Sequence, residues 1–310
     1  MKSSIHLLAV IFITISLQGC FHDDDSKYCP SVEPVVDANS IFFADVSQGI
    51  EYVGSGEHQL AIACHNCYDN ASEYAIETEM IIESAISNNA DLIELDVVMS
   101  DVEGQVAYIS HESTTTGPLF SDVIANSLLI NASQILFLEI KAQLDLKENV
   151  RELFRQLMAH KINDVTYAYF NSQRFTVIRS IETDKTLRRF REVLEENEFE
   201  QIRPFIKLSR LFYPKEESAM INEIGQVHSC GFHMIELDTR IGIESIKSLN
   251  AYADTLGLAV NVFTIDESNY SSFVNELKHD VDVITVETRE FNSADETSLF
   301  QKVRALLLTD

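Results

Sequence analysis

Acidic side chains spaced two residues apart stand out at two places in the sequence. Glu94 and Asp96 lie in one short apolar run, and Glu139 lies in another, two residues before Lys141. Side chains two apart on a β-strand point to the same face of the sheet. A carboxylate that faces a packed interior is costly unless a partner compensates for its charge. These spacings therefore predict a polar site where the two strands meet.

Further polar residues belong to the same predicted site. His65 and Asn66 follow an apolar run, and His111 comes a short distance after Asp96. Carboxylate and amide oxygens are hard donors, which suit Ca²⁺ or Mg²⁺ and do not suit zinc. Two histidines beside such an ion can transfer protons, one taking a proton from an attacking hydroxyl and one giving a proton to a leaving oxygen. Lys141 would offset negative charge for an anionic substrate.

Eight apolar runs are the candidate strands that carry these residues. From residue 59 onward they alternate with amphipathic stretches, as in a parallel sheet with helices between the strands. The runs cover residues 60–64, 92–97, 135–140, 166–170, 205–208, 234–237, 259–264 and 281–286. Eight such units in about 250 residues match a (β/α)₈ TIM barrel, whose active sites lie at the carboxyl ends of the strands. We therefore predict one α/β barrel over residues 59–310.

One segment breaks the alternation of strands and helices. The stretch between Asp96 and His111 is too short for a parallel crossover, which needs a dozen or more residues in addition to its strands. We predict instead a β-hairpin, in which the second strand continues to Met99, turns over residues 101–104 and returns over 105–110. The returning arm would bring His111 back to the mouth of the barrel.

The first 19 residues have the pattern of a signal peptide. Lys2 is their only charged residue, and residues 5–17 are mostly apolar. Such a run is short for the ~30 Å of a bilayer's hydrocarbon, which favours a cleaved signal over a permanent span. Residues 17–20 read Leu-Gln-Gly-Cys and resemble the lipobox of bacterial lipoproteins, which implies lipidation of Cys20. Ordinary secretion is the alternative.

The lipoprotein resemblance also implies a location. Phe21, not Asp, follows Cys20, which in Gram-negative lipoproteins favours the outer membrane, facing the periplasm or the cell surface. Residues 20–58 contain Pro and Gly without sustained periodicity, and we interpret them as a tether and entry segment. We thus expect a signal over 1–19, a tether over 20–58 and a lipid-anchored barrel.

The composition excludes some classes of protein. The chain has 310 residues, of which 45% are hydrophobic, so it can build a core and is not disordered. It carries 49 acidic and 23 basic residues, for a formal net charge of −26. Nucleic-acid binding needs basic surfaces, so a nucleic-acid partner is excluded. Charge gives no attraction to anionic lipids either, so membrane attachment would depend on the lipid anchor.

The cysteines are more consistent with structural roles than with a metal site. Cys64 and Cys67 have the spacing of a zinc or redox motif, but no second cysteine pair or histidine cluster completes a zinc site. Outside the cytoplasm, Cys29, Cys64, Cys67 and Cys230 could form zero, one or two disulfides. The spacing does not choose among the pairings.

The order of the motifs resembles the phospholipase C-like phosphodiesterase superfamily, which contains phosphatidylinositol-specific phospholipases C and glycerophosphodiester phosphodiesterases. The runs 93–97 and 138–141 are similar to the glycerophosphodiesterases, whereas 65–68 and 111–124 are more similar to eukaryotic-type phospholipases C. The resemblance implies that Asn66, Glu94, Asp96 and Glu139 bind the metal, that His65 and His111 are catalytic, and that Lys141 contacts the phosphate.

Two departures from the superfamily's patterns are informative. Glycerophosphodiesterases have Arg after the first His, where this chain has Asn66. In the metal-dependent phospholipases C the matching Asn is a calcium ligand. Phe263 and Thr264 stand where glycerophosphodiesterases have a characteristic Trp-Thr, so the resemblance of the second half is weaker.

The resulting hypothesis is a divalent-metal-dependent phosphoric diester hydrolase that acts on a glycerophosphodiester or phosphoinositide-type substrate. A sphingomyelinase D-like phospholipase or lyase is the alternative enzyme. A catalytically silent binding lipoprotein that keeps the barrel is the alternative outside enzymes. Glu236 and Asp238 repeat the acidic spacing on the predicted sixth strand, and we interpret them as a pocket or stability feature. Lys207 is as compatible with solvation as with phosphate binding.

Overall fold

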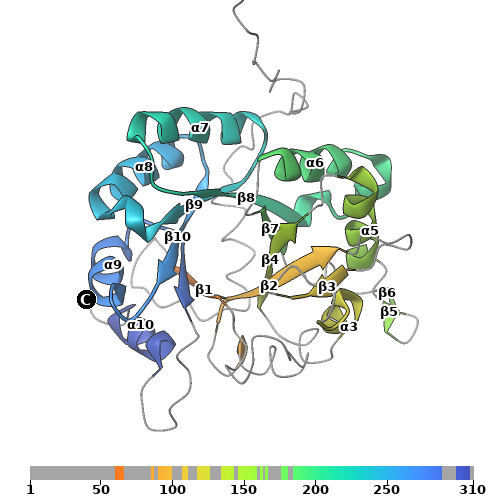
Figure 1. The fold of residues 1–310 in the computed structure, drawn as a ribbon, viewed down its shortest axis with the longest axis horizontal. Coiled ribbons are helices and arrows are strands. Elements are labelled where there is room, and N and C mark those ends of the chain that lie inside the picture. Colours follow the sequence, from red (N-terminus) through yellow and green to blue (C-terminus); the bar gives the residue numbers. More distant parts are fainter. Residues whose placement is uncertain are drawn as a thin grey trace, which may run out of the picture.

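Parallel strands close into a barrel surrounded by helices in a computed structural model of the protein (Figure 1). The ribbon shows the helices on the outside, between consecutive strands along the chain. The structure describes residues 60–65, 85–86, 90–99, 107–110, 117–125, 134–142, 146–158, 161–162, 165–166, 176–180, 184–287 and 298–307. The predicted signal and tether lie outside these residues.

The barrel is an eight-stranded (β/α)₈ barrel, as the sequence predicts. Its strands, in spatial order, are β1 (Ala61–His65), β2 (Leu92–Met99), β4 (Ile135–Ala142), β7 (Thr176–Ser180), β8 (Ile206–Phe212), β9 (Met234–Asp238), β10 (Ala259–Ile265) and β11 (Val283–Glu287). Parallel pairing of β1 with both β11 and β2 closes the ring. Closure leaves no unpaired edge among the barrel strands, which is why the fold can bury all of them.

The strands are buried on both faces, as parallel strands between helices usually are. All eight residues of β2 are buried. On the inner face, small and apolar side chains occupy the first half of the barrel strands other than β8, where the buried Lys207 is in register with Val177. Polar side chains follow toward the carboxyl ends of the strands. The apolar inner residues are Ala61, Ala63, Leu92, Ile135, Phe137, Val177, Met234, Ala259 and Val283. This packed lower layer supports the polar layer that holds the candidate site.

The helices cover the outer face of the barrel through one apolar stripe each. Their bounds are α3 (Phe120–Ile124), α5 (Lys147–Met158), α6 (Asp184–Leu194), α7 (Glu217–Ser229), α8 (Ile243–Thr255), α9 (Tyr270–Leu277) and α10 (Leu299–Leu307). In α8, Ile246, Leu249 and Ala253 are buried, as their spacing predicts. Gly257 follows with a φ of 69°, a left-handed conformation that ends the helix at little cost because glycine has no Cβ. Single helical turns occur at Asn197–Phe199, Arg203–Phe205 and Thr239–Ile241.

The predicted hairpin after the second strand is present. β3 (Ala107–Ile109) pairs antiparallel with the end of β2, with Val97 opposite Ile109. The backbone N–H of Ser110 donates to the carbonyl oxygen of Asp96 at 2.9 Å. The returning arm therefore comes back beside Asp96, one residue before His111.

The position of the fourth barrel strand differs from the prediction. Residues 166–170 are rich in aromatic side chains and were the expected strand, but Val165–Thr166 is the two-residue strand β6, which pairs antiparallel with β5 (Lys161–Ile162). The barrel uses β7 instead, in register with β4 and β8. Its sequence, Thr-Val-Ile-Arg-Ser, contains an arginine that the strand buries. A buried arginine is tolerated only with partners from other strands, which local sequence does not reveal.

Among the residues that the structure describes, no helix combines the length and the apolar character needed to cross a membrane.

Candidate active site

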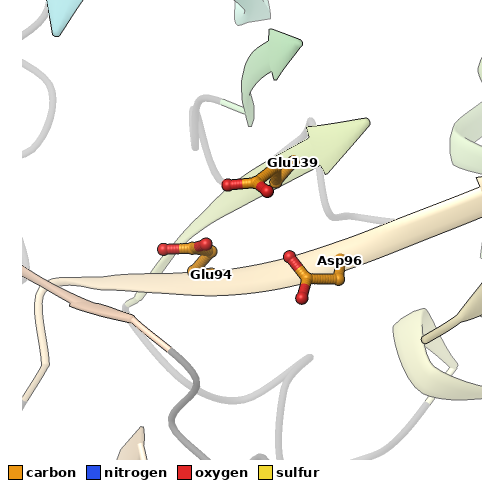
Figure 2. Close-up of side chains that lie close together, drawn as sticks. All are labelled: Glu94, Asp96 and Glu139. Atoms are coloured by element: carbon orange, nitrogen blue, oxygen red, sulfur yellow. The ribbon is translucent and has the colours of Figure 1, made fainter. Parts of the chain in front are cut away.

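Three carboxylates meet at the polar end of the barrel, as predicted. Figure 2 shows Glu94 and Asp96 on β2 and Glu139 on the neighbouring strand β4. Asp96 is in register with Glu139, which brings their side chains together. One oxygen from each carboxylate lies within 4.8 Å of the others, and all three residues are buried. Period two on β2 and strand register with β4 are thus sufficient to build the cluster.

Lys141 neutralises part of this charge. Its Nζ lies 3.2 Å from Oδ1 of Asp96 and also contacts Oε1 of Glu139. Burial would lower the pKa of Lys141, but the carboxylates of Asp96 and Glu139 outweigh it and raise that pKa. Lys141 therefore stays charged at the edge of the cluster.

Arg179 on β7 is part of the site, although the sequence did not indicate it. Its Nη2 donates to Oε1 of Glu94 at 2.5 Å and contacts Oε2 of Glu139. Its Nη1 donates to Oε2 of Glu236, on β9, at 2.9 Å. The guanidinium also lies over the ring of Phe137, 4.8 Å from its centroid. One buried arginine thus links carboxylates from three strands.

His65 at the end of β1 is held by a residue that the sequence analysis also missed. Its Nδ1 forms a 3.0 Å hydrogen bond with Oε2 of Glu287, the residue in register with it on β11. Its Nε2 lies 3.7 Å from Oε1 of Glu94. Burial would lower the pKa of His65, but Glu94 and Glu287 outweigh it and raise that pKa. The ring is therefore oriented with Nε2 toward the carboxylates.

The two glutamates have pKa values shifted in opposite directions, although burial acts on both in the same way. Burial raises the pKa of Glu94 to about 8, and the attraction of Arg179 and His65 offsets only part of the cost. Burial acts in the same direction on Glu139, but Arg179 and Lys141 outweigh it and lower its pKa to about 2. Of the two glutamates, Glu94 is thus the one whose charge the neighbouring cations compensate less.

The cluster fits a hard divalent cation. Oε2 of Glu94 is buried and has no hydrogen-bond partner among the described residues. Glu94, Asp96, Glu139 and Glu236 face the two cationic side chains Lys141 and Arg179, so acidic groups outnumber cationic ones and would attract a divalent cation. Oxygen donors alone favour Ca²⁺ or Mg²⁺ over a softer metal.

Several predicted site residues lie outside the described residues. They are Asn66, which follows His65, His111, which follows Ser110, and the lipidation candidate Cys20. Their roles stay predictions.

Other polar residues take structural positions. Glu236 and Asp238 face inward on β9: Glu236 pairs with Arg179, and Asp238 accepts several hydrogen bonds from Arg240. Lys207 is buried on β8 and is not a solvated surface lysine. Cys64 and Cys230 are each disulfide-bonded, which agrees with structural cysteines and excludes these two from a zinc site. Cys29 and Cys67 lie outside the described residues.

Comparison with known proteins supports the fold. No protein-family model matches the sequence, and no curated protein matches it. Among solved structures, a glycerophosphodiester phosphodiesterase from Parabacteroides distasonis matches with 16% identity and a TM-score of 0.53, covering 81% of this chain and 98% of that chain. A putative glycerophosphodiester phosphodiesterase from Galdieria sulphuraria matches with 14% identity and a TM-score of 0.54, covering 83% and 100%. This chain has their fold.

A third similar structure contains a bound product, and a fourth is an enzyme with a different reaction, so the fold alone does not identify the reaction. A phosphodiesterase from Oleispira antarctica, determined with the product sn-glycerol-3-phosphate, matches with 12% identity and a TM-score of 0.52, covering 80% of this chain and 97% of that chain. Tryptophan synthase from M. tuberculosis matches with 11% identity and a TM-score of 0.50, covering 87% and 96%. The resemblance predicted from the motifs is thus confirmed at the level of the fold. The reaction has to be argued from the site.

Proposed function

We propose that this protein is a divalent-cation-dependent hydrolase of phosphodiesters. The observation that carries the proposal is the buried cluster of Glu94, Asp96 and Glu139, beside a histidine held by a glutamate. A barrel interior does not need such a cluster for stability, because buried like charges oppose folding. Perturbed carboxylates in this arrangement are typical of functional sites.

The proposed ligands of the cation are Glu94, Asp96 and Glu139, with the amide oxygen of Asn66 as a fourth. When bound, the cation would stabilise the negative charge that develops on the phosphoryl oxygens. Lys141 has three N–H donors, of which two are accounted for by Asp96 and Glu139. Its third donor is proposed to bind a phosphoryl oxygen of the substrate.

The proton transfers are assigned to the two histidines. With Nδ1 bound to Glu287, Nε2 of His65 is the nitrogen that can accept a proton from the attacking hydroxyl or water. Glu287 would then stabilise the imidazolium, as a carboxylate does in other histidine-dependent sites. His111 is proposed to protonate the leaving oxygen, and the return of the chain to Asp96 at Ser110 supports its placement at the barrel mouth.

The proposed substrate is a glycerophosphodiester or a phosphoinositide-type lipid. The glycerol phosphate bound by the Oleispira antarctica phosphodiesterase, which shares the fold, supports the first class. The occurrence of Asn66 after His65, where the similar phospholipases C have a calcium ligand, supports the second.

A substrate panel tests the proposal. Purified full-length protein is incubated with glycerophosphocholine, glycerophosphoinositol or phosphatidylinositol vesicles, each with Mg²⁺ or Ca²⁺, and phosphorylated products are identified by mass spectrometry. We expect hydrolysis of at least one diester and a loss of at least about 100-fold in kcat for His65→Ala. His279→Ala, a change at an exposed histidine, is the control. The proposal fails if no diester is cleaved, or if His65→Ala is as active as the control.

We also propose that Cys20 carries a lipid that attaches the protein to the outer membrane. The apolar run over 5–17 and the lipobox-like residues 17–20 support this. Labelling of expressing bacteria with an alkyne fatty acid should mark the wild-type protein and leave Cys20→Ser unmarked. Equal labelling of both proteins, or of neither, would overturn the proposal.

A further inference from the structure

Arg179 holds a position that the proposed chemistry does not use. It is almost completely buried inside the barrel, with 2% of its surface exposed, and it carries a full charge there. Its Nη2 contacts one oxygen of Glu94 and one oxygen of Glu139, two of the proposed cation ligands. A guanidinium is a rigid planar fork, so it fixes the directions of the carboxylates that it binds.

The guanidinium is itself anchored from the opposite side. Oε2 of Glu236 accepts from Nη1 of Arg179 and from Nδ2 of Asn261, each at 2.9 Å. Nδ2 of Asn261 also lies 2.8 Å from Oγ1 of Thr285, which donates back to Oδ1 of Asn261 at 3.1 Å. All four side chains are buried. A hydrogen-bonded series therefore runs from β11 through β10 and β9 to Arg179 on β7.

The consequence appears at Glu94. Arg179 binds Oε1 of this residue, and Oε2 remains without a hydrogen-bond partner among the described residues. One carboxylate oxygen of Glu94 lies within 4.8 Å of one oxygen each of Asp96 and Glu139. At Glu139, Arg179 binds Oε2 while Lys141 binds Oε1. Each glutamate is thus restrained by a cationic donor whose own position the barrel determines.

We propose that Arg179, anchored by Glu236, is a positioning residue that orients Glu94 and Glu139 as ligands of the divalent cation and thereby sets the affinity of the site. This inference rests on the cation site of the proposed function. The competing explanation is charge balance alone, in which Arg179 only offsets buried carboxylates. Single removal of Arg179 would change the charge of the site and its geometry together, so its effect on cation binding does not separate the two explanations.

Two variants separate positioning from charge balance. Arg179→Met together with Glu236→Gln removes one positive and one negative charge, so the net charge of the cluster is unchanged and the fork is lost. Arg179→Lys keeps the charge, but an ammonium cannot span the three carboxylates as a guanidinium does. Charge balance predicts near-normal cation binding in both variants, and positioning predicts weaker binding in both.

The measurement is Mn²⁺ binding to the full-length chain, followed by electron paramagnetic resonance of the free ion, with thermal unfolding recorded for each protein. We expect the dissociation constant to rise at least about 10-fold in both variants, the size of effect seen when residues that orient metal ligands are removed. The matched control is Arg210→Met with Glu223→Gln, a pair that joins β8 to helix α7, with Nη2 and Oε2 2.7 Å apart. We expect the control to bind like the wild type.

The outcomes are distinct. If the wild type binds Mn²⁺ and both test variants bind it more weakly, positioning is supported. If the double variant does not fold, Arg179→Lys alone gives the result. If the folded test variants bind Mn²⁺ with a dissociation constant within about threefold of the wild-type value, the positioning inference is wrong, but the proposed cation site is unaffected. Failure of the wild type to bind Mn²⁺ overturns the cation site, and the inference with it.

Discussion

Glu287 and His65 stand directly opposite each other on neighbouring strands of the barrel and are joined by a 3.0 Å hydrogen bond between Oε2 and Nδ1. An ionised carboxylate only accepts hydrogen bonds, so the proton of a neutral His65 ring is held on Nδ1. This leaves the lone pair on Nε2, which faces Glu94 at 3.7 Å. Strand register between β1 and β11 therefore determines which nitrogen of His65 can act as a base.

Removal of Glu287 should lower the rate of the chemical step. In Glu287→Ala the His65 ring loses both its fixed orientation and the charge that stabilises the imidazolium, so we expect kcat to fall about 10- to 100-fold with little change in KM. Glu287→Gln should be intermediate, because an amide oxygen can still accept from Nδ1. Steady-state kinetics on the best diester of the panel checks this. Wild-type kcat in Glu287→Ala would show that Glu287 does not orient the base.

Cation binding should stabilise the folded protein. A ligand that binds only the native state at 100 times its dissociation constant adds about 2.7 kcal/mol to the free energy of unfolding. We expect saturating Mg²⁺ or Ca²⁺ to raise the melting temperature of the wild type and to have little effect on Asp96→Asn. Asp238→Asn is the matched control, because Asp238 has the same spacing from Glu236 as Asp96 has from Glu94. If Asp96→Asn keeps the cation-induced shift in melting temperature and Asp238→Asn loses it, the cation binds near β9 and the proposed site on β2 is wrong.

Asp91 should make stability depend on pH. It precedes β2, accepts a hydrogen bond from the backbone N–H of Ile62 at 2.8 Å, and lies 3.4 Å from Nη2 of Arg304. Burial raises the pKa of Asp91 from its ordinary 3.8 to about 6, with Arg304 and the N–H of Ile62 offsetting part of the cost. Between these values the folded state binds more protons than the unfolded state. Stability from this group is therefore greatest below about pH 4 and falls as the pH rises through 6.

Urea unfolding at pH 4.5 and pH 7.5 tests this contribution. A shift of about two pKa units corresponds to at most about 3 kcal/mol. We expect the loss of unfolding free energy between the two pH values to be smaller in Asp91→Asn than in the wild type by up to about 2 kcal/mol, because part of the full effect already occurs below pH 4.5. The amide oxygen of Asn can still accept from Ile62, so the variant should fold. An identical pH dependence in the two proteins would mean that Asp91 ionises normally.

Reduction of the disulfides should destabilise the barrel. Cys64 ends the buried part of β1, one residue before His65, and Cys230 caps the end of α7. A native disulfide typically contributes about 2–4 kcal/mol to the free energy of unfolding. We expect a reducing agent to lower the melting temperature. The same melting temperature with and without the reducing agent would contradict a stabilising role of the disulfides.

Residue spacing was enough to predict the carboxylate cluster. Two inward residues per strand, Glu94 and Asp96 on β2 and Glu139 and Lys141 on β4, follow from period two once the runs are recognised as strands. The hairpin that returns to Asp96 follows from the length of the segment. Both features depend only on neighbouring residues, so they can be predicted from the spacing of side chains and the length of a segment.

The partners that hold the cluster depend on contacts between distant strands. Arg179 was missed because the aromatic run at 166–170 has the higher strand propensity, whereas the arginine in β7 is stabilised by carboxylates on β2, β4 and β9. Glu287 was missed because the predicted last strand ended at residue 286. The signal for Glu287 was available, since it lies two residues after the inward Thr285 and so shares its face.

The most direct test of the proposed function is the release of glycerol phosphate from glycerophosphocholine or glycerophosphoinositol by the full-length protein, followed by phosphorus NMR before and after addition of EDTA. We predict that the product signal grows with Mg²⁺ or Ca²⁺ present, that EDTA slows its growth at least about 100-fold, and that excess cation restores it. Asp96→Asn should be inactive in every condition. A hydrolysis rate that EDTA leaves unchanged and that Asp96→Asn retains would contradict a cation-dependent site built on Glu94, Asp96 and Glu139.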